Sequence, residues 1–228
     1  MKPYHWFLLL TFLAVWIWAA INPIFPHDWL LENYLVFVFV PIIFILGRIF
    51  KLSNVSYTLL TLFLILHVIG SHYTYAEVPF GDTLQEWFGG TRNMYDRLVH
   101  FGSGFLLFYP IREMFMRLAK VKGFWSYLFP IDLLGSFSAI YEMIEWKAAQ
   151  VVAPEAGLAF LGSQGDVWDA QKDMGLALLG ACIAAVIVML INMRYKNDFW
   201  QDMKESFKLD KNDRELGEVE LSRMRNEK

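Results

Sequence analysis

The chain has 228 residues, of which 56% are hydrophobic, and a formal net charge of −3 at pH 7. This composition excludes an ordinary soluble domain, and the grouping of apolar residues in blocks is typical of an integral membrane protein. The sequence has no basic stripe and no aromatic platform motif, so no nucleic-acid partner is expected.

Six apolar blocks follow one another, and each approaches or reaches the roughly 20 residues that a helix needs to cross the hydrocarbon core. They cover residues 6–21, 29–50, 55–75, 98–116, 124–146 and 174–193. The first block follows Lys2 and could be a cleaved signal peptide, but Trp16 and Trp18 crowd its end, so we expect it to be retained. The sequence therefore predicts an all-α fold, a polytopic membrane helix bundle with six transmembrane helices over residues 1–193.

The remaining residues, 194–228, are predicted to form a charged cytoplasmic tail. Four apolar residues of its first part share one helical side, which favours an amphipathic helix on the membrane surface. They are Phe199, Trp200, Met203 and Phe207. Beyond Asp210 charged residues predominate, and we expect disorder there.

The orientation follows from the basic residues in the short connections. Those after the second, fourth and sixth blocks carry most of them: Arg48, Lys51, Arg117, Lys120, Lys122, Arg194 and Lys196. The first connection has none, and the other two have two each beside more numerous acids. The positive-inside rule then places both termini in the cytoplasm and the acidic connections outside.

The first two blocks carry almost no ionisable residues, and we expect them to support the other helices or face lipid. The third carries His67 near its outer end, where a hydrogen bond to a neighbour is a more common role for a histidine than a metal bond. Before the fourth block, Asp96 and His100 are four residues apart, so on a helix the carboxylate can orient the imidazole. Arg97 is a candidate counter-charge for nearby acids. We expect the connection of residues 76–92 to cap the bundle, and that of residues 148–164 to cover its outer surface.

The fifth block supplies Glu142 and Glu145, which are three residues apart and project to the same side of a helix. Glu142 lies about one turn inside the predicted outer boundary. A carboxylate at that depth is unfavourable without a partner, so a functional or structural role is expected.

Residues 165–174 carry the densest acidic pattern of the chain. On a helix, Asp166, Asp169 and Asp173 would share one side, and the small residues Ala177 and Gly180 continue that face in a form suited to close helix packing. Three grouped carboxylates repel one another, so Arg, Lys, His or a metal ion must lie opposite them. Lys172 lies within the same stretch.

The motifs at residues 95–101, 141–146 and 165–174 resemble those of the YjdF-type family of bacterial inner-membrane proteins, a domain of unknown function. More distantly they are similar to VanZ-like proteins, which are linked to glycopeptide-antibiotic resistance. The shared positions are Asp96, His100, Phe101, Glu142 and Asp169, while Asp173 stands where the VanZ-like pattern has Asn. The resemblance implies an inner-membrane location and a link to lipid or envelope processes.

Three functions remain open from the sequence. The first is a membrane-embedded enzyme or binding site at the outer face, formed by His100, Glu142, Glu145, Asp166, Asp169 and Asp173. Carboxylates with an imidazole suit a divalent metal, for which His100, Glu142, Asp169 and Asp173 are the candidate ligands, and the metal would act on or bind a membrane lipid. Because Cys182 is the single cysteine and lies in an apolar block, such a site would use oxygen and nitrogen ligands.

The second function is a small-solute or ion transporter whose acids relay protons or hold a cation. The third is a structural network in which Arg92, Arg97, Lys147 and Lys172 neutralise the acids. The bases are fewer than the acids, so this last interpretation requires that one or two carboxyl groups stay protonated. Asp96, Arg97, His67 and Lys172 are expected to support the site in any of the three.

Overall fold

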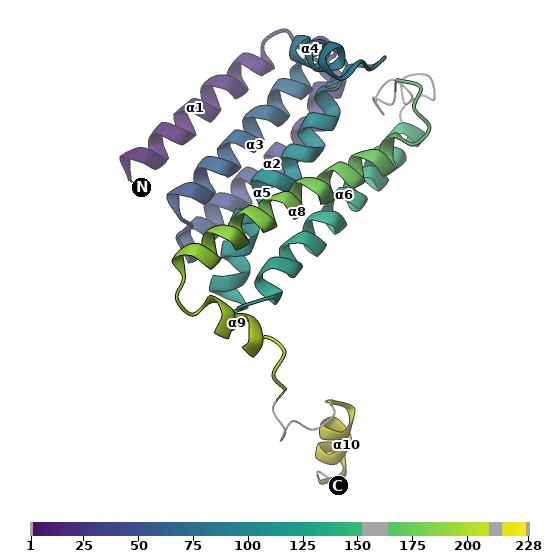
Figure 1. Cartoon of the computed structure of the whole chain (residues 1–228). Coiled ribbons are helices and arrows are strands. Elements are labelled where there is room, and N and C mark those ends of the chain that lie inside the picture. The colour runs from purple at the N-terminus through teal and green to yellow at the C-terminus, as the bar shows by residue number, and fades with distance from the viewer. Residues whose placement is uncertain (1, 152–163, 210–215, 227–228) are drawn as a thin grey trace.

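The computed structural model describes residues 2–151, 164–209 and 216–226 of the chain. Within these ranges the regular structure is entirely helical, and the long helices pack side by side as a bundle (Figure 1). The all-α prediction is therefore confirmed. The predicted cover by residues 148–164 lies almost wholly outside the described residues.

Each of the six apolar blocks forms a long helix. The helices are α1 (Pro3–Ala20), α2 (Pro26–Ile49), α3 (Asn54–His72), α5 (Tyr95–Leu118), α6 (Trp125–Val151) and α8 (Asp169–Tyr195). By length and composition, α1, α2, α3 and α8 are apolar enough to cross a membrane. In contrast, α5 and α6 contain more polar and ionisable side chains and do not reach the same hydropathy. The structure thus shows four candidate spans among the described residues, where the sequence predicts six.

Helix α5 lies at the centre of the bundle. It packs against α8, α3 and α6, while α3 also contacts α1 and α2 (Figure 1). Because α5 has neighbours on several sides, its polar side chains can meet partners from other helices instead of lipid. The ionisable residues at its first turns are placed in this way.

Small residues bring α5 and α8 into close contact, as the sequence predicts. A Cβ added to Gly180 would lie 2.2 Å from the carbonyl oxygen of Phe101, and one added to Gly104 would meet the backbone of Ala177. Glycine is required at both positions because the two backbones touch. This contact holds the first turns of α5 beside those of α8, where Asp173 lies.

A short helix, α4 (Pro79–Phe88), covers the end of the bundle at which α5 begins. It ends at Gly89, whose φ of 65° requires the left-handed conformation that glycine adopts readily. The amide of Asn93 then donates to the carbonyl of Val78 at 2.9 Å and to Asp82 at 2.7 Å. The predicted ordered cap is confirmed, and it fixes the residues just before α5.

At the opposite end, α9 (Phe199–Glu205) folds back onto the bundle. Phe199 is only 4% exposed and packs with Phe108 and Tyr127, whereas Trp200 stays 62% exposed. A helix therefore forms where the sequence predicts an amphipathic one, but Phe199 is buried in the bundle, in a cluster with residues of α5, α6 and α8.

Helix α10 (Leu216–Asn226) occupies part of the tail for which the sequence predicts disorder. Its acids, Glu218 and Glu220, precede its bases, Arg223 and Arg225, an order that complements the helix dipole, and Glu220 and Arg223 approach to 3.5 Å. A count of charges does not reveal this order, which favours a helix.

Candidate functional site

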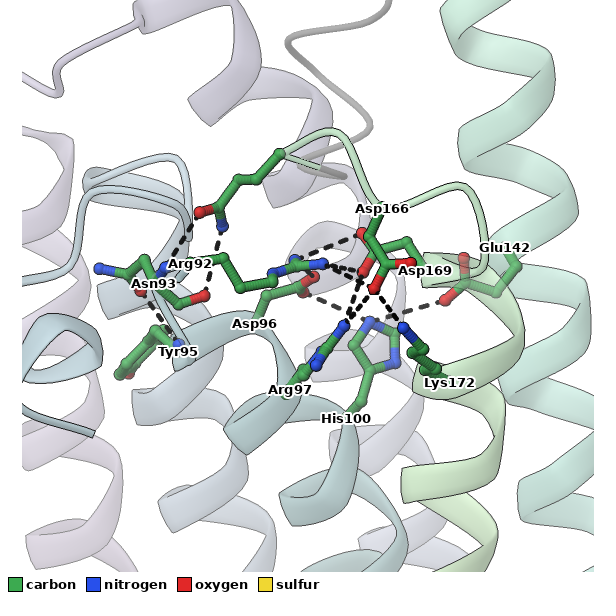
Figure 2. Close-up of polar contacts among 11 residues, drawn as sticks. Arg92, Asn93, Tyr95, Asp96, Arg97, His100, Glu142, Asp166, Asp169 and Lys172 are labelled. Atoms are coloured by element: carbon green, nitrogen blue, oxygen red, sulfur yellow. Dashed lines mark hydrogen bonds and ion pairs between the residues drawn. The ribbon is translucent and has the colours of Figure 1, made fainter. Parts of the chain in front are cut away.

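Ionisable side chains from five segments of the chain meet where α5 and α8 begin (Figure 2). They are Arg92, Asp96, Arg97, His100, Glu142, Asp166, Asp169, Lys172 and Asp173. The central pair joins Arg92 to Asp169, and its guanidinium donates to both carboxylate oxygens. Each of these side chains is only 9% exposed. This bidentate ion pair is geometrically specific and shielded from water, so it fixes the start of α8 against the segment before α5.

Asp166 lies in the turn before α8, because the helix begins only at Asp169. The prediction that three aspartates share one helical face is wrong for Asp166. Gly165 has a φ of 87°, and the Asp166 carboxylate accepts the backbone N–H of Trp168 at 3.1 Å, which stabilises a turn instead of a helix.

The Asp166 carboxylate nevertheless remains in the site, at its outer rim. It accepts from Lys172 at 2.6 Å and from Arg97 at 2.6 Å. The hydrogen bond from Lys172, together with that from the Trp168 backbone, lowers the pKa of Asp166 to about 2. Arg97 and Lys172 thus act as counter-charges, in the positions that the sequence predicts.

His100 lies between two carboxylates deeper in the site. Its Nε2 atom is 3.4 Å from an oxygen of Asp96 and 3.6 Å from an oxygen of Glu142 (Figure 2). Asp96 is one turn before His100 on α5, whereas Glu142 reaches the imidazole from α6. The predicted pairing of Asp96 with His100 is confirmed.

Asp173 completes this inner group from α8. One ligand atom from each of Asp96, His100 and Asp173 lies within 4.8 Å of the other two. Asp173 is 2% exposed, and its Oδ1 atom has no hydrogen-bond partner among the described residues. Oε1 of Glu142 is likewise buried without a hydrogen bond in this part of the chain. Buried oxygens without partners are unfavourable, so their presence at one point calls for a cation or a proton.

Asp169 and Glu145, two other predicted site residues, do not join this inner group. Asp169 is held by Arg92, as described above. Glu145 is three residues beyond Glu142 on α6 and is not among the described residues that approach His100. The hydroxyl of Tyr141 donates to Glu32 at 2.8 Å, so α2 and α6 are joined by a second buried polar cluster.

His67 belongs to this second cluster and not to the inner group. Its Nε2 atom lies 3.1 Å from the backbone carbonyl of Glu32, which can only accept, so Nε2 carries the hydrogen. Its Nδ1 atom then accepts from the hydroxyl of Tyr75 at 2.5 Å. Both ring nitrogens are occupied, which confirms the predicted hydrogen-bonding role and leaves no lone pair for a metal.

The roles of the two residues that organise these clusters do not follow from the sequence. The sequence makes Arg92 a candidate neutralising base, but nothing near it in the chain identifies Asp169, 77 residues away, as its partner. Glu32 lies on α2, which was expected to be featureless, yet it is only 7% exposed. The available signal was the adjacent pair Glu32 and Asn33 inside an otherwise apolar block.

Comparison with known proteins agrees with the helical membrane architecture. Residues 4–194 match the profile of the family described as "Predicted membrane protein (DUF2238)". The chain is also 37% identical over 191 residues to "Inner membrane protein YjdF" of Escherichia coli (strain K12), a match that covers 83% of this chain and 91% of that protein. No solved structure matches the chain. The resemblance to VanZ-like proteins rests on the sequence motifs alone.

Proposed function

We propose that the chain, which belongs to the family of predicted membrane proteins (DUF2238), is a multi-pass inner-membrane protein that binds a divalent cation. The cation would lie at the inner group of Asp96, His100 and Asp173, and through it the protein would bind a membrane lipid. The observation that carries this proposal is the Asp173 carboxylate, which is 2% exposed and has, within the described chain, an oxygen without a hydrogen-bond partner beside His100 and Asp96. In this proposal α5 and α6 cross the membrane with the four apolar helices, since their polar groups face one another inside the bundle.

The proposed ligands are Asp96, His100 and Asp173, with Glu142 as a fourth. Two or three carboxylates and one imidazole suit a borderline divalent ion such as Mn²⁺, Fe²⁺ or Zn²⁺. The ligand atoms of Asp96, His100 and Asp173 already lie within 4.8 Å of one another, which is compatible with bonds of about 2.0–2.3 Å to a shared ion. Asp169 was among the ligands predicted from sequence, and Asp96 takes its place because Arg92 already engages Asp169.

The local charges favour a doubly charged ion. Five carboxylates meet in the described part of the site, opposed by the three permanent cations Arg92, Arg97 and Lys172. His100 must be neutral to bind a metal, so with His100 as a ligand two negative charges remain. One divalent cation would balance them without protonating any acid. Bound there, the ion would polarise a phosphoryl or carbonyl oxygen or activate a water molecule.

A groove next to the site supports a lipid as the ligand. It has a volume of about 340 Å³ and is lined by Arg97 and Lys172 together with Leu176 and Leu179 of α8. Cations at one end and aliphatic side chains below them match an anionic headgroup and an acyl chain. The positive-inside rule puts this end of the bundle at the outer surface, with both termini in the cytoplasm.

The ion pairs of the rim favour a second candidate, a purely structural network. Arg92 with Asp169, and Lys172 with Asp166, are the pairs that such a network needs. The network does not account for Asp173 and Glu142, unless each carries a proton. The two candidates therefore differ in whether Asp173 holds a metal or a proton.

Metal analysis of the full chain, purified in mild detergent without chelator, distinguishes them. The wild type is expected to contain about one equivalent of metal, or to bind added Mn²⁺ stoichiometrically, and Asp173→Asn is expected to lose it. Asp132→Asn changes an exposed acid on α6 and serves as the matched control, which should keep the metal. A wild type that binds none of Mn²⁺, Fe²⁺ and Zn²⁺ would overturn the proposal in favour of the structural network.

A further inference from the structure

A second polar cavity lies at the other end of the bundle, where α9 folds back. It has a volume of about 480 Å³, and its walls come from the last turns of α5 and α8, the start of α6, and α9. Among its lining residues are Arg112, Lys122, Ser126 and Met203. The cavity shares no residue with the proposed metal site, and on α5 the two are separated by about 18 Å or more, since Arg112 is twelve residues beyond His100.

Arg112 is the unusual residue of this cavity. It is only 8% exposed, and its guanidinium lies 4.4 Å above the ring of Tyr127. One of its nitrogens donates to the hydroxyl of Ser126 at 3.2 Å, but its buried Nε has no partner among the described residues. No carboxylate of the described chain lies within 4 Å of it either. A buried guanidinium normally has an anionic partner, because the loss of hydration is otherwise uncompensated.

The acids around the cavity do not fill this role, because they already have other partners. Glu113 accepts from the backbone N–H of Ser53 at 2.9 Å and the hydroxyl of Ser56 at 2.6 Å, and it pairs with Arg117 at 3.1 Å. Asp202 pairs with Lys196, and Asp198, whose side chain is 59% exposed, lies 3.7 Å from the same lysine. In the described residues Arg112 and Lys122 are therefore the cavity's cations without a carboxylate partner.

We propose that this cavity binds a phosphate group, held by the guanidinium of Arg112 and the ammonium of Lys122. The planar fork of arginine matches two phosphate oxygens, and Ser126 with Tyr127 holds the guanidinium in place from behind. The volume of 480 Å³ has room for more than a bare phosphate ion. Two sources have this chemistry: the headgroup of an anionic phospholipid, and free inorganic phosphate.

Binding to the full chain in detergent tests the proposal, with inorganic phosphate, phosphatidylglycerol and phosphate-free diacylglycerol as probes. A phosphate ligand should raise the melting temperature of the wild type, because it binds the folded chain only. Arg112→Gln should weaken that ligand at least about tenfold, since a charge-assisted hydrogen bond is worth that much or more. Lys122→Gln changes an exposed residue and tests the site even if the Arg112 variant fails to fold. Lys120→Gln changes another exposed lysine, one that does not line the cavity, and is the control, which should bind nearly as the wild type does.

The probes also identify the source. Stabilisation by inorganic phosphate that competes with phosphatidylglycerol supports a site open to free phosphate, while stabilisation by phosphatidylglycerol alone supports a lipid headgroup. Equal stabilisation by diacylglycerol would overturn the proposal, because the phosphate would then contribute nothing. The proposal would also be overturned if neither phosphate probe stabilised the wild type, or if the wild type, Arg112→Gln and Lys122→Gln bound these probes equally. Metal content is expected to stay unchanged in these variants, so the two sites are tested separately.

Discussion

The carbonyl oxygen of Ala177 lies so close to Gly104 that a Cβ on that glycine would be 1.8 Å from it. We predict that Gly104→Ala pushes α8 away from α5 and lowers the free energy of unfolding by about 1–3 kcal/mol, the usual effect of overpacking. Thermal unfolding in detergent, followed by tryptophan fluorescence, measures the change. Gly102→Ala on the same helix is the matched control, because its Cβ would be 3.5 Å from Leu66, an ordinary contact. Equal stabilities of the two variants would refute a specific backbone contact.

Arg92→Gln is expected to destabilise the fold by up to about 3–5 kcal/mol, because in the described chain the buried Asp169 carboxylate would keep only the more distant Arg97, at 3.6 Å. Adding Asp169→Asn should recover part of the loss, since the buried negative charge is then removed as well. Chemical unfolding of the two single variants and the double variant gives the coupling. For comparison, Arg117→Gln breaks a pair whose arginine is 48% exposed, and it should cost less than about 1 kcal/mol. If the effects at Arg92 and Asp169 simply added, the pair would not be the central contact described here.

Tyr141→Phe removes the hydroxyl that donates to Glu32 at 2.8 Å. It should lower the free energy of unfolding by about 1–3 kcal/mol, because a buried carboxylate loses a donor. Tyr34→Phe alters an exposed tyrosine of α2 and should have little effect on stability. Metal content measured on the same samples should not change. A loss of metal in the Tyr141 variant would show that the two polar clusters act as one.

The depressed pKa of Asp166, about 2, gives the rim a predictable pH dependence. In the unfolded chain this carboxyl titrates near 3.8, so the stabilisation by Lys172 and the Trp168 backbone is complete above that pH and is lost as the pH falls towards 2. Melting temperatures of wild type and Asp166→Asn should differ most above pH 4 and converge between about pH 4 and 2. Parallel curves over that interval would contradict the assigned contacts.

Local spacing was sufficient to predict the helices and some of the site. The apolar blocks located all six long helices, and the spacing of Asp96 and His100 on one helix predicted their contact. Small residues of α8 predicted its close packing, which Gly180 and Phe101 show. These features depend on residues within a few turns of one helix, where the periodicity of 3.6 residues determines which side chains are neighbours.

The remaining features depend on which helices meet, and a single sequence does not specify that. Arg92 and Asp169 are 77 residues apart, and Tyr141 and Glu32 are 109 apart. The helical phase predicts Glu142 and Glu145 on one side, yet only Glu142 approaches His100, at 3.6 Å, while the hydroxyl of Tyr141 on the same helix donates to Glu32 of α2. The prediction for Asp166 is wrong because Gly165 adopts a left-handed conformation in the turn before the helix, so that α8 begins only at Asp169.

The pairing of α5 with α8 also has a consequence in time. α5 is less apolar than the four helices that meet the hydropathy requirement for a span, and its main packing partner is α8, the last long helix. The ribosome must add the 77 residues from Arg92 to Asp169 before the central ion pair can form. At typical rates of synthesis this takes on the order of 4–15 s. During that interval the glycine surface of α5 and the guanidinium of Arg92 await their partners, so this is when the nascent chain most depends on the insertion machinery or on a membrane chaperone.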